Sequence, residues 1–215
     1  MPEPGPGAAA ASTVIRTAEE LAALYPAPHP LVAGKKMAAL DPGVQAVIGM
    51  SPLVMLATTG RDGVPTVSPR GGHPGFVRVL DAHRLALPDL PGNRLIDSMR
   101  HLVENPHAGL LFLVPGHETL LRVEGRAEIV TDPELTAGLA GPDGRVPAAA
   151  VVVTVETLFL HCGASLRRSG VWDPASWGTD ADALDAAERA HWAHVKAVRT
   201  GEAVSPPGPG TAPRS

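Results

Sequence analysis

Residues 87–94 include residue types that could hold a phosphate. They lead from a predicted strand into a helix predicted over residues 94–104. The start of a helix offers unpaired N–H groups and a partial positive charge, so it attracts anions. Arg94 and Ser98 lie in the first turns of this predicted helix, where a guanidinium and a hydroxyl could bind the same phosphate. The alternative is a structural turn in which Gly92 makes the bend and Asn93 caps the helix.

Arg70 is a second basic residue in a setting that suits a ligand. It ends a predicted strand and precedes Gly71 and Gly72, where a backbone without Cβ atoms would let a flat ligand approach closely. A solvent-facing arginine before a glycine turn is the alternative. Two such arginines in one small protein favour phosphate capture. His73 is the nearest titratable residue that could act as acid or base, although a loop histidine more often does neither.

The remaining chemistry-bearing residues are fewer and less specific. Arg168 and Trp172 follow the last predicted strand, and together they suit a ligand that is anionic or planar. The alternative is a surface turn in which Trp172 anchors the packing. His117 begins a zinc-protease pattern, but Leu121 stands where its second histidine would be, so no metal site is expected. Cys162 is the only cysteine; we expect it to be buried, and it cannot form an internal disulfide.

Composition excludes several classes of function. The 215 residues are 44% apolar and 19% charged, which is typical of one globular domain. A net charge of −4 and 3% aromatic residues argue against a nucleic-acid partner, which needs a basic face and stacking rings. The sequence has no apolar run long enough to span a bilayer and no basic leader at its start. We therefore expect a cytoplasmic protein that binds neither nucleic acid nor membrane.

Short strands and tight turns dominate the middle of the chain. Gly60 to Gly63 predicts one turn, and the polar residues 81–83 predict another. The apolar run 108–114 is typical of a fully buried strand, while strict alternation over 121–129 predicts one inward and one charged face. Strands are expected at 54–59, 64–67, 78–80, 84–87, 108–114, 121–129 and 151–155. This pattern favours an antiparallel barrel or sandwich, mainly β with flanking helices (α+β).

Helices and tails complete the predicted organisation. A helix over 17–24 begins at Thr17, with Glu20 completing a capping box, and a second is expected over 31–40, ended by Asp41-Pro42-Gly43. A late helix is expected over 180–198. The predicted parts are a disordered tail (1–12), a helical segment (13–45), a barrel (46–175), a C-terminal helix (176–200) and a second disordered tail (201–215).

The order of motifs from residue 53 to about residue 172 resembles a subfamily of the pyridoxamine phosphate oxidase-like, FMN-dependent split-barrel proteins. The resemblance rests on Ser68-Pro69-Arg70-Gly71, on 75–81, on Pro88-Asp89-Leu90-Pro91-Gly92-Asn93-Arg94 with Asp97-Ser98, and on 111–116 and 121–127. It implies a six-stranded antiparallel split β-barrel and a homodimer with FMN in clefts at the subunit interface. It implies FMN binding by Ser68, Arg70, Gly71, Pro88, Asp89, Asn93, Arg94, Ser98, Arg168 and Trp172.

The sequence also departs from that family. Relatives usually carry an acidic residue where Gly72 stands and a lysine where Ala164 stands. They often carry an arginine where Leu90 stands, and a threonine is common in place of Leu120. We therefore expect an FMN-dependent oxidoreductase whose small-molecule substrate is not pyridoxamine phosphate. The alternatives are a deazaflavin-dependent reductase and a non-catalytic binder of flavin or haem, with His161 as the axial haem ligand.

Overall fold

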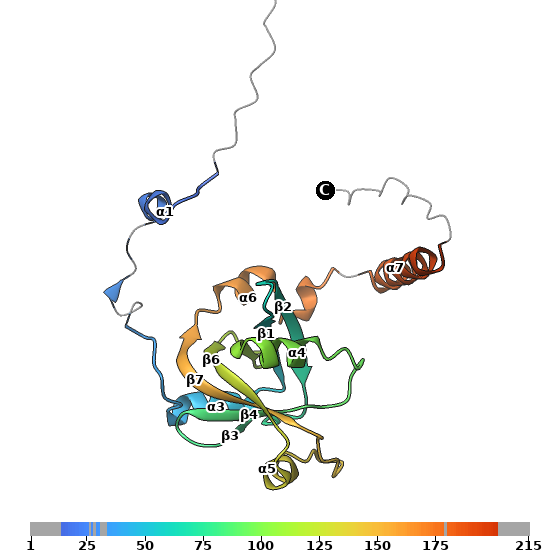
Figure 1. The fold of residues 1–215 in the computed structure, drawn as a ribbon. Helices are drawn as coiled ribbons and strands as arrows, with labels where there is room; N and C mark the ends of the chain where they lie inside the picture. Colours follow the sequence, from blue (N-terminus) through green and yellow to red (C-terminus); the bar gives the residue numbers. More distant parts are fainter. Residues whose placement is uncertain (1–13, 26, 28, 31–33, 179, 202–215) are drawn as a thin grey trace, which may run out of the picture. The chain divides into compact units, whose positions relative to one another are not determined.

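The computed structural model describes residues 14–25, 27, 29–30, 34–178 and 180–201 of the chain (Figure 1). The chain divides into two compact units, Met1–Gly163 and Ala164–Ser215, and each is described by itself. The predicted tails, residues 1–12 and 201–215, lie outside the described residues except for Gly201, which ends the last helix.

The first unit is built on one antiparallel sheet of seven strands in the order β2-β1-β5-β6-β7-β4-β3. The strands are β1 (Leu53–Thr59), β2 (Pro65–Gly71), β3 (Arg78–Val79), β4 (Arg84–Pro88), β5 (His107–Leu113), β6 (Leu120–Val130) and β7 (Ala150–His161). The prediction of a mainly antiparallel β fold with flanking helices is confirmed. The sheet has seven strands rather than six, however, and it is not closed, because β2 and β3 end it without pairing to each other.

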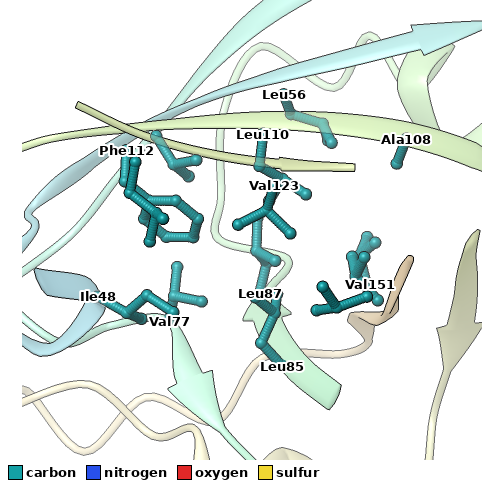
Figure 2. Packing of buried hydrophobic residues seen from close by; sticks show 14 of the residues in the cluster. Ile48, Leu56, Val77, Leu85, Leu87, Ala108, Leu110, Phe112, Val123 and Val151 are labelled. Carbon is teal, nitrogen blue, oxygen red and sulfur yellow. The ribbon is translucent and has the colours of Figure 1, made fainter. Parts of the chain in front are cut away.

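Alternation along the strands places one set of side chains in a shared core. Figure 2 shows Leu56 of β1, Leu110 and Phe112 of β5, and Val123 of β6 converging on one apolar interior. The helix α3 (Pro42–Met50) adds Ile48 to the same cluster, and the side chain of Ile48 is fully buried. Burial of these side chains is the main contribution to the stability of this unit.

The strand expected over 108–114 was predicted to be fully buried, and this was wrong for four of its seven residues. In β5, Leu110 and Phe112 are buried, whereas Leu111 and Leu113 are only half-buried. The cause is the pleat, which turns successive side chains to opposite faces of the sheet. An apolar run therefore does not prove that both faces of its strand are covered.

The helix α1 (Ala18–Leu24) confirms the predicted capping box. The Thr17 hydroxyl accepts the Glu20 N–H at 3.1 Å, and the Glu20 carboxylate accepts the N–H groups of Arg16 and Thr17 at 2.8 and 3.4 Å. Both halves of the capping box thus form.

The helix expected over 31–40 does not form in its described part, residues 34–40. A helix that was not predicted, α3 (Pro42–Met50), begins where that one was expected to end. Asp41 caps α3 by accepting the N–H groups of Gly43 and Val44, at 2.8 and 3.1 Å, and Pro42 occupies the first helical position. An Asp-Pro pair starts a helix well because proline needs no hydrogen bond there, so the predicted stop is in fact a start.

The helix α4 (Asp97–Glu104) is shorter than the predicted 94–104, because it begins three residues later. The remaining helix of this unit is α5 (Pro133–Gly138). The second unit contains α6 (Ala164–Ser169), the 3-10 turn η1 (Pro174–Ser176) and α7 (Ala181–Thr200). The helix α7 corresponds to the late helix that was predicted, and Asp180 is its N-cap. None of the described helices combines the length and apolar character needed to cross a bilayer.

Candidate functional site

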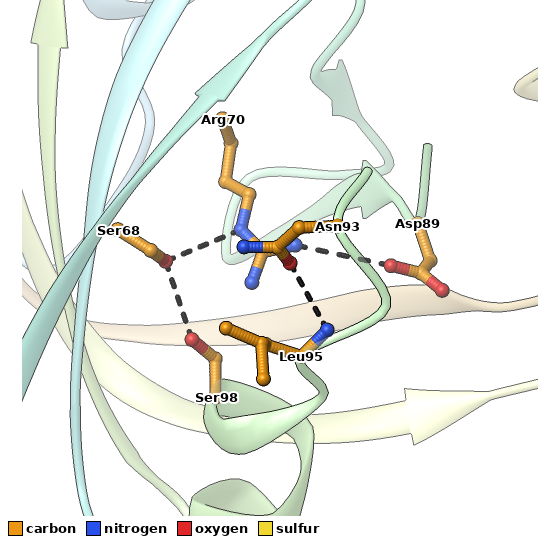
Figure 3. A network of polar contacts seen from close by, with 6 residues as sticks. All are labelled: Ser68, Arg70, Asp89, Asn93, Leu95 and Ser98. Carbon is orange, nitrogen blue, oxygen red and sulfur yellow. Dashed lines mark hydrogen bonds and ion pairs between the residues drawn. The ribbon is translucent and has the colours of Figure 1, made fainter. Parts of the chain in front are cut away.

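A network of polar side chains lies where β2 meets the start of α4 (Figure 3). The Ser68 and Ser98 hydroxyl oxygens are 3.2 Å apart, and the Arg70 Nε donates to the Ser68 hydroxyl at 3.3 Å. The other side of the same guanidinium faces Asp89, with Nη1 3.8 Å from the carboxylate. One arginine therefore connects a pair of hydroxyls to an acidic residue.

Strand geometry explains why these side chains meet. Thr66, Ser68 and Arg70 lie two residues apart on β2, so all three project from the same face of the strand. Ser98 comes from the first turn of α4 and is 95% buried against that face, with a relative exposure of 5%. The two hydroxyls and the guanidinium are thus brought together by one strand face and one helix start.

The start of α4 adds backbone donors to this network. Its N-cap residue is Ile96, whose side chain cannot accept a hydrogen bond. The N-cap side chain therefore does not pair with the first N–H groups of the helix. Asn93, expected to be the cap, accepts instead from the Leu95 N–H at 3.0 Å and fixes the loop before the helix. The helix dipole and free amides favour an anion here, whereas the Asp97 carboxylate in the first turn opposes one.

The network lines a cleft of about 460 Å³, called the first cleft below. Its polar residues include Ser68, Arg70, Asn93 and Ser98, and its apolar walls include Phe76 and Pro88. A neighbouring second cleft of about 380 Å³ shares Arg70 with it and adds Asp89, Arg94 and Arg145. The segment 90–93 and Leu95 line both clefts, so the two lie on either side of the same loop.

The residues predicted as a cofactor site divide between these two clefts. The first cleft is lined by Ser68, Arg70, Gly71, Pro88, Asn93 and Ser98. The second is lined by Arg70, Asp89, Asn93 and Arg94. The predicted pair of arginines therefore meets at the second cleft, whereas the hydroxyls lie with Arg70 in the first.

Four other predicted residues lie elsewhere. His73 lines a separate surface cleft of about 500 Å³ with Gln45. His161 is exposed at the end of β7, where its ring lies 5.4 Å from that of Phe159. Arg168 and Trp172 belong to the second unit, Arg168 within α6.

Several residues that line these clefts were not predicted, among them Thr66, Phe76 and Arg145. Thr66 lines the first cleft, and extending the period of two back from Ser68 would have found it. Phe76 lines the same cleft but gave no polar signal. Arg145 lines the second cleft from a loop more than fifty positions after Arg94, a proximity that only the fold creates.

Arg94 has an unusual backbone conformation, with a φ of +61°. It is the one residue other than glycine with a positive φ among those that the structure describes. This region is strained for a residue with a Cβ, and such strain often marks a functional position. Because α4 begins only at Asp97, Arg94 lies in the loop before the helix rather than in its first turn.

Two further findings concern Gly72 and Cys162. A Cβ at Gly72 would lie 2.7 Å from the Phe76 side chain, so the acidic residue common in relatives has no room unless Phe76 moves. Cys162 is exposed, contrary to prediction, because it directly follows the end of β7. In the described part of the chain, no group of three or more His, Cys, Asp or Glu side chains could hold a metal ion.

Comparison with known proteins gives a family match over the sheet. Residues 40–162 match the family model described as pyridoxamine 5'-phosphate oxidase. Among solved structures, HupZ of Group A Streptococcus is 22% identical with a TM-score of 0.46, over 56% of this chain and 92% of that chain. A protein of Clostridium acetobutylicum that is related to general stress protein 26, and is described as of the pyridoxinephosphate oxidase family, is 20% identical with a TM-score of 0.40, over 54% of this chain and 84% of that chain.

An F420 reductase is 22% identical with a TM-score of 0.40, over 55% of this chain and 97% of that chain. No curated protein matches the sequence.

Proposed function

The chain belongs to the pyridoxamine 5'-phosphate oxidase family, and from this premise we propose that it is an FMN-dependent oxidoreductase acting on a small molecule other than pyridoxamine phosphate. The observation that carries the proposal is the set of anion-binding groups in the first cleft. Arg70, Ser68 and Ser98 converge there beside the open start of α4.

These groups fit the phosphate end of FMN. A guanidinium offers charge-assisted hydrogen bonds, two hydroxyls offer O–H donors, and the helix start offers backbone N–H groups. Pro69, Phe76 and Pro88 supply apolar wall against which a flat ring system can lie. When bound, FMN supplies the hydride-transfer chemistry.

The residues of the chain act on the cofactor by position and charge. The Asp89 carboxylate lies 3.8 Å from Nη1 of Arg70, and the Ser68 hydroxyl accepts a hydrogen bond from Nε of Arg70. The guanidinium is therefore held from two sides. The side chain of Arg70 is 25% exposed, which lets it reach a ligand while water screens its charge less than at an open surface. Ser98 is buried against Ser68, so its hydroxyl has a fixed position.

The same surroundings argue for a different substrate from that of the family's namesake. Phe76 fills the space beside Gly72 where an acidic side chain would project. Leu90, at a position where relatives often carry arginine, lines both clefts and packs against the core. Cofactor binding is therefore retained in this proposal, while polar groups around the substrate are lost.

A flavin titration tests the proposal. The purified protein should show the two visible flavin bands, and dithionite should bleach them. Arg70→Ala should weaken FMN binding by about 1.5–3 kcal/mol, the loss of one charge-assisted hydrogen bond to phosphate. Arg126→Ala, which removes an exposed arginine of β6, is the control.

Four outcomes would contradict the proposal or a part of it. A Soret band would replace flavin by haem, and tighter binding of a deazaflavin than of FMN would make the protein a deazaflavin reductase. Equal FMN affinity of the wild type and Arg70→Ala would mean that the phosphate binds elsewhere. Efficient oxidation of pyridoxamine phosphate would refute the part of the proposal that concerns the substrate.

We further propose that the protein is a homodimer. The outer face of strands β2, β1 and β5 is apolar: it consists of Val67, Pro69, Leu53, Met55, Ala57, Leu111 and Leu113. Val67 is 67% exposed, and the other six are exposed or half-buried. Val67 and Pro69 also line the first cleft, so a second copy seated on this outer apolar face would border the proposed flavin site.

A further inference from the structure

The helix α7 has one side that carries no charged side chain when histidine is neutral. None of its residues is buried, and Leu184 and Val198 on this side are 61% and 60% exposed. At 3.6 residues per turn, an arc of about 100° around the helix holds only uncharged residues. This arc, called the α7 seam below, consists of Leu184, Ala187, His191, His194, Val195 and Val198.

The charged residues of α7 divide by sign along the helix. The first half holds Asp182, Asp185 and Glu188, and the second half holds Arg189, Lys196 and Arg199. None of the six forms an ion pair with another residue in the part of the chain that the structure describes. The helix dipole favours acidic residues in the first turn and basic residues in the last, where Asp182 and Arg199 lie. It does not reach Asp185 or Lys196, so the dipole accounts for only part of this order.

The order of these charges complements itself when a second α7 runs in the opposite direction. We consider two such helices that cross between positions 190 and 191. Asp182 then faces Arg199 of the other helix and Asp185 faces Lys196, because the two aspartates lie as far before the crossing as their partners lie after it. One register therefore serves both pairs, and two-fold symmetry forms each of them twice.

The same register also matches side chains by size. Leu184, Val195 and Val198 face alanines of the other helix, at positions 197, 186 and 183. Large side chains opposite small ones let two helices approach closely and interdigitate. A membrane surface suits α7 less well, because its three acidic and three basic residues cancel, whereas helices that lie on membranes are rich in Lys and Arg.

We propose that the α7 helices of the two copies in the homodimer pair antiparallel along their seams, with Asp182 and Asp185 of each copy opposite Arg199 and Lys196 of the other. The pairing rests on the proposed homodimer, since 20 residues make fewer than three heptads, which is short for a free-standing coiled coil. Between two copies that are already joined at the outer apolar face, a weak second contact can form.

Spin labels on the full-length protein test the direction of the pair. Cys162 is the only cysteine, so in a Cys162→Ser background Ala193→Cys or Thr200→Cys gives one label per copy. In the antiparallel pair, the two labels at position 193 are about 8 Å apart along the helix axis, and those at position 200 about 28 Å. Double electron–electron resonance should therefore give a defined distance at both positions, longer at position 200 by roughly 10 Å.

Charge reversal tests the register. Asp182→Lys with Asp185→Lys sets like charges opposite Arg199 and Lys196, so the fraction of molecules with the defined distance at position 193 should fall at least fivefold. Adding Lys196→Glu and Arg199→Glu should restore it. Helix stability cannot explain such a recovery, because the fourfold variant opposes the helix dipole more than the double variant does.

A matched control separates this effect from net charge. Glu128→Lys with Glu134→Lys changes two exposed acidic residues of the first unit by the same charge, and it should leave the distance unchanged. All of these variants should keep the dimer mass in light scattering, because the outer apolar face is intact in each.

The outcomes that would overturn the pairing differ from those that would overturn the dimer. A protein with the dimer mass but equal distances at positions 193 and 200 would have parallel helices. A dimer without a measurable distance would show that the seam covers another part of the same chain or nothing. Failure of the fourfold variant to recover would refute the proposed ion pairs. A wild-type monomer would refute the homodimer itself, and the pairing of α7 with it.

Discussion

Arg94 combines a strained backbone with a side chain that lines a cationic cleft. At a φ of +61° a Cβ costs about 1 kcal/mol relative to glycine. Arg94→Ala and Arg94→Gly both remove the guanidinium, but only the glycine variant relieves the strain. In urea unfolding, we expect Arg94→Gly to be more stable than Arg94→Ala by about 1 kcal/mol.

Arg100 provides the matched control for this comparison. It is exposed in the interior of α4, where a glycine weakens the helix. The order should therefore reverse, with Arg100→Ala more stable than Arg100→Gly by about 1 kcal/mol. The same order at both positions would show that the backbone at Arg94 carries no strain.

Single residues of the candidate site were predictable to the extent that local patterns placed them. Strand period places Ser68 and Arg70 on one face, and Ser98 lies near the start of a helix, but only the family resemblance grouped the three residues that meet in the first cleft. Arg94 was expected beside Ser98 because the helix was expected to begin there; since it begins at Asp97, Arg94 lines the second cleft. Arg145 could not be predicted, because no local pattern relates it to Arg70.

At the scale of elements, the contact between β6 and β7 depends on Gly125. The register of the two strands shifts between Glu124 and Gly125, and a Cβ at Gly125 would lie 2.0 Å from the Thr154 carbonyl oxygen. Gly125→Ala must therefore displace one of the two strands. We expect a loss of about 1–3 kcal/mol in the free energy of unfolding, measured in urea.

Gly109 of β5 is the matched strand glycine for this test. Its Cβ would meet Ala57 at 3.7 Å, an ordinary contact, so Gly109→Ala should leave stability unchanged or raise it by up to about 1 kcal/mol. Equal stability of Gly125→Ala and Gly109→Ala would contradict the close approach of the Thr154 carbonyl oxygen to Gly125.

The turn between β3 and β4 gives a pH-dependent prediction. The pKa of Asp81 lies below its usual 3.8, chiefly because the carboxylate accepts the His83 N–H at 2.8 Å, and also because Arg84 donates to it at 2.7 Å. Because this pKa is lowered by folding, the ionised carboxylate stabilises the folded state at every pH above the pKa that Asp81 has in the unfolded chain. This stabilisation is lost as the pH falls through the pKa that Asp81 has in the folded protein.

Carboxyl ¹³C titration should therefore place the pKa of Asp81 below 3.8. In urea unfolding, the stability advantage of the wild type over Asp81→Asn should shrink as pH falls through this range. An Asp81 carboxyl that titrates at or above 3.8 would contradict the turn geometry.

Elements were predictable where a cap or an alternation was local. The capping box at Thr17, the turn at Gly60 to Gly63 and the alternation of β6 all formed as expected. The start of α3 was misread because Asp41-Pro42-Gly43 serves equally as a stop or as a cap followed by a first-turn proline. Which role it takes depends on the core partner of the following residues, and here Val44 and Ile48 bury into the sheet unit.

At the scale of the whole molecule, the pairing of distant strands and the closure of the sheet were the least predictable features. They depend on which distant strands pair, as in β1 with β5 and β4 with β7, and no turn between neighbours encodes this. The resulting open sheet leaves apolar side chains on its outer face at β2, β1 and β5. Soluble monomers rarely leave such a contiguous apolar face uncovered.

A charge placed on this outer apolar face should therefore break the proposed dimer. The wild type should have twice the monomer mass by light scattering, whereas Met55→Lys should have the monomer mass, because a lysine ammonium is costly to bury in an apolar interface. FMN affinity should fall together with the mass, since Val67 and Pro69 belong both to this face and to the first cleft.

Two further variants keep this test decisive. Val67→Lys changes a residue that is 67% exposed, so it should break the dimer without disturbing the core even if half-buried Met55→Lys proved unstable. Val103→Lys places the same charge on α4 at a valine that is 78% exposed and outside this face, and it should remain dimeric. A wild-type monomer, or dimers of both Met55→Lys and Val67→Lys, would show that a second copy does not cover this face.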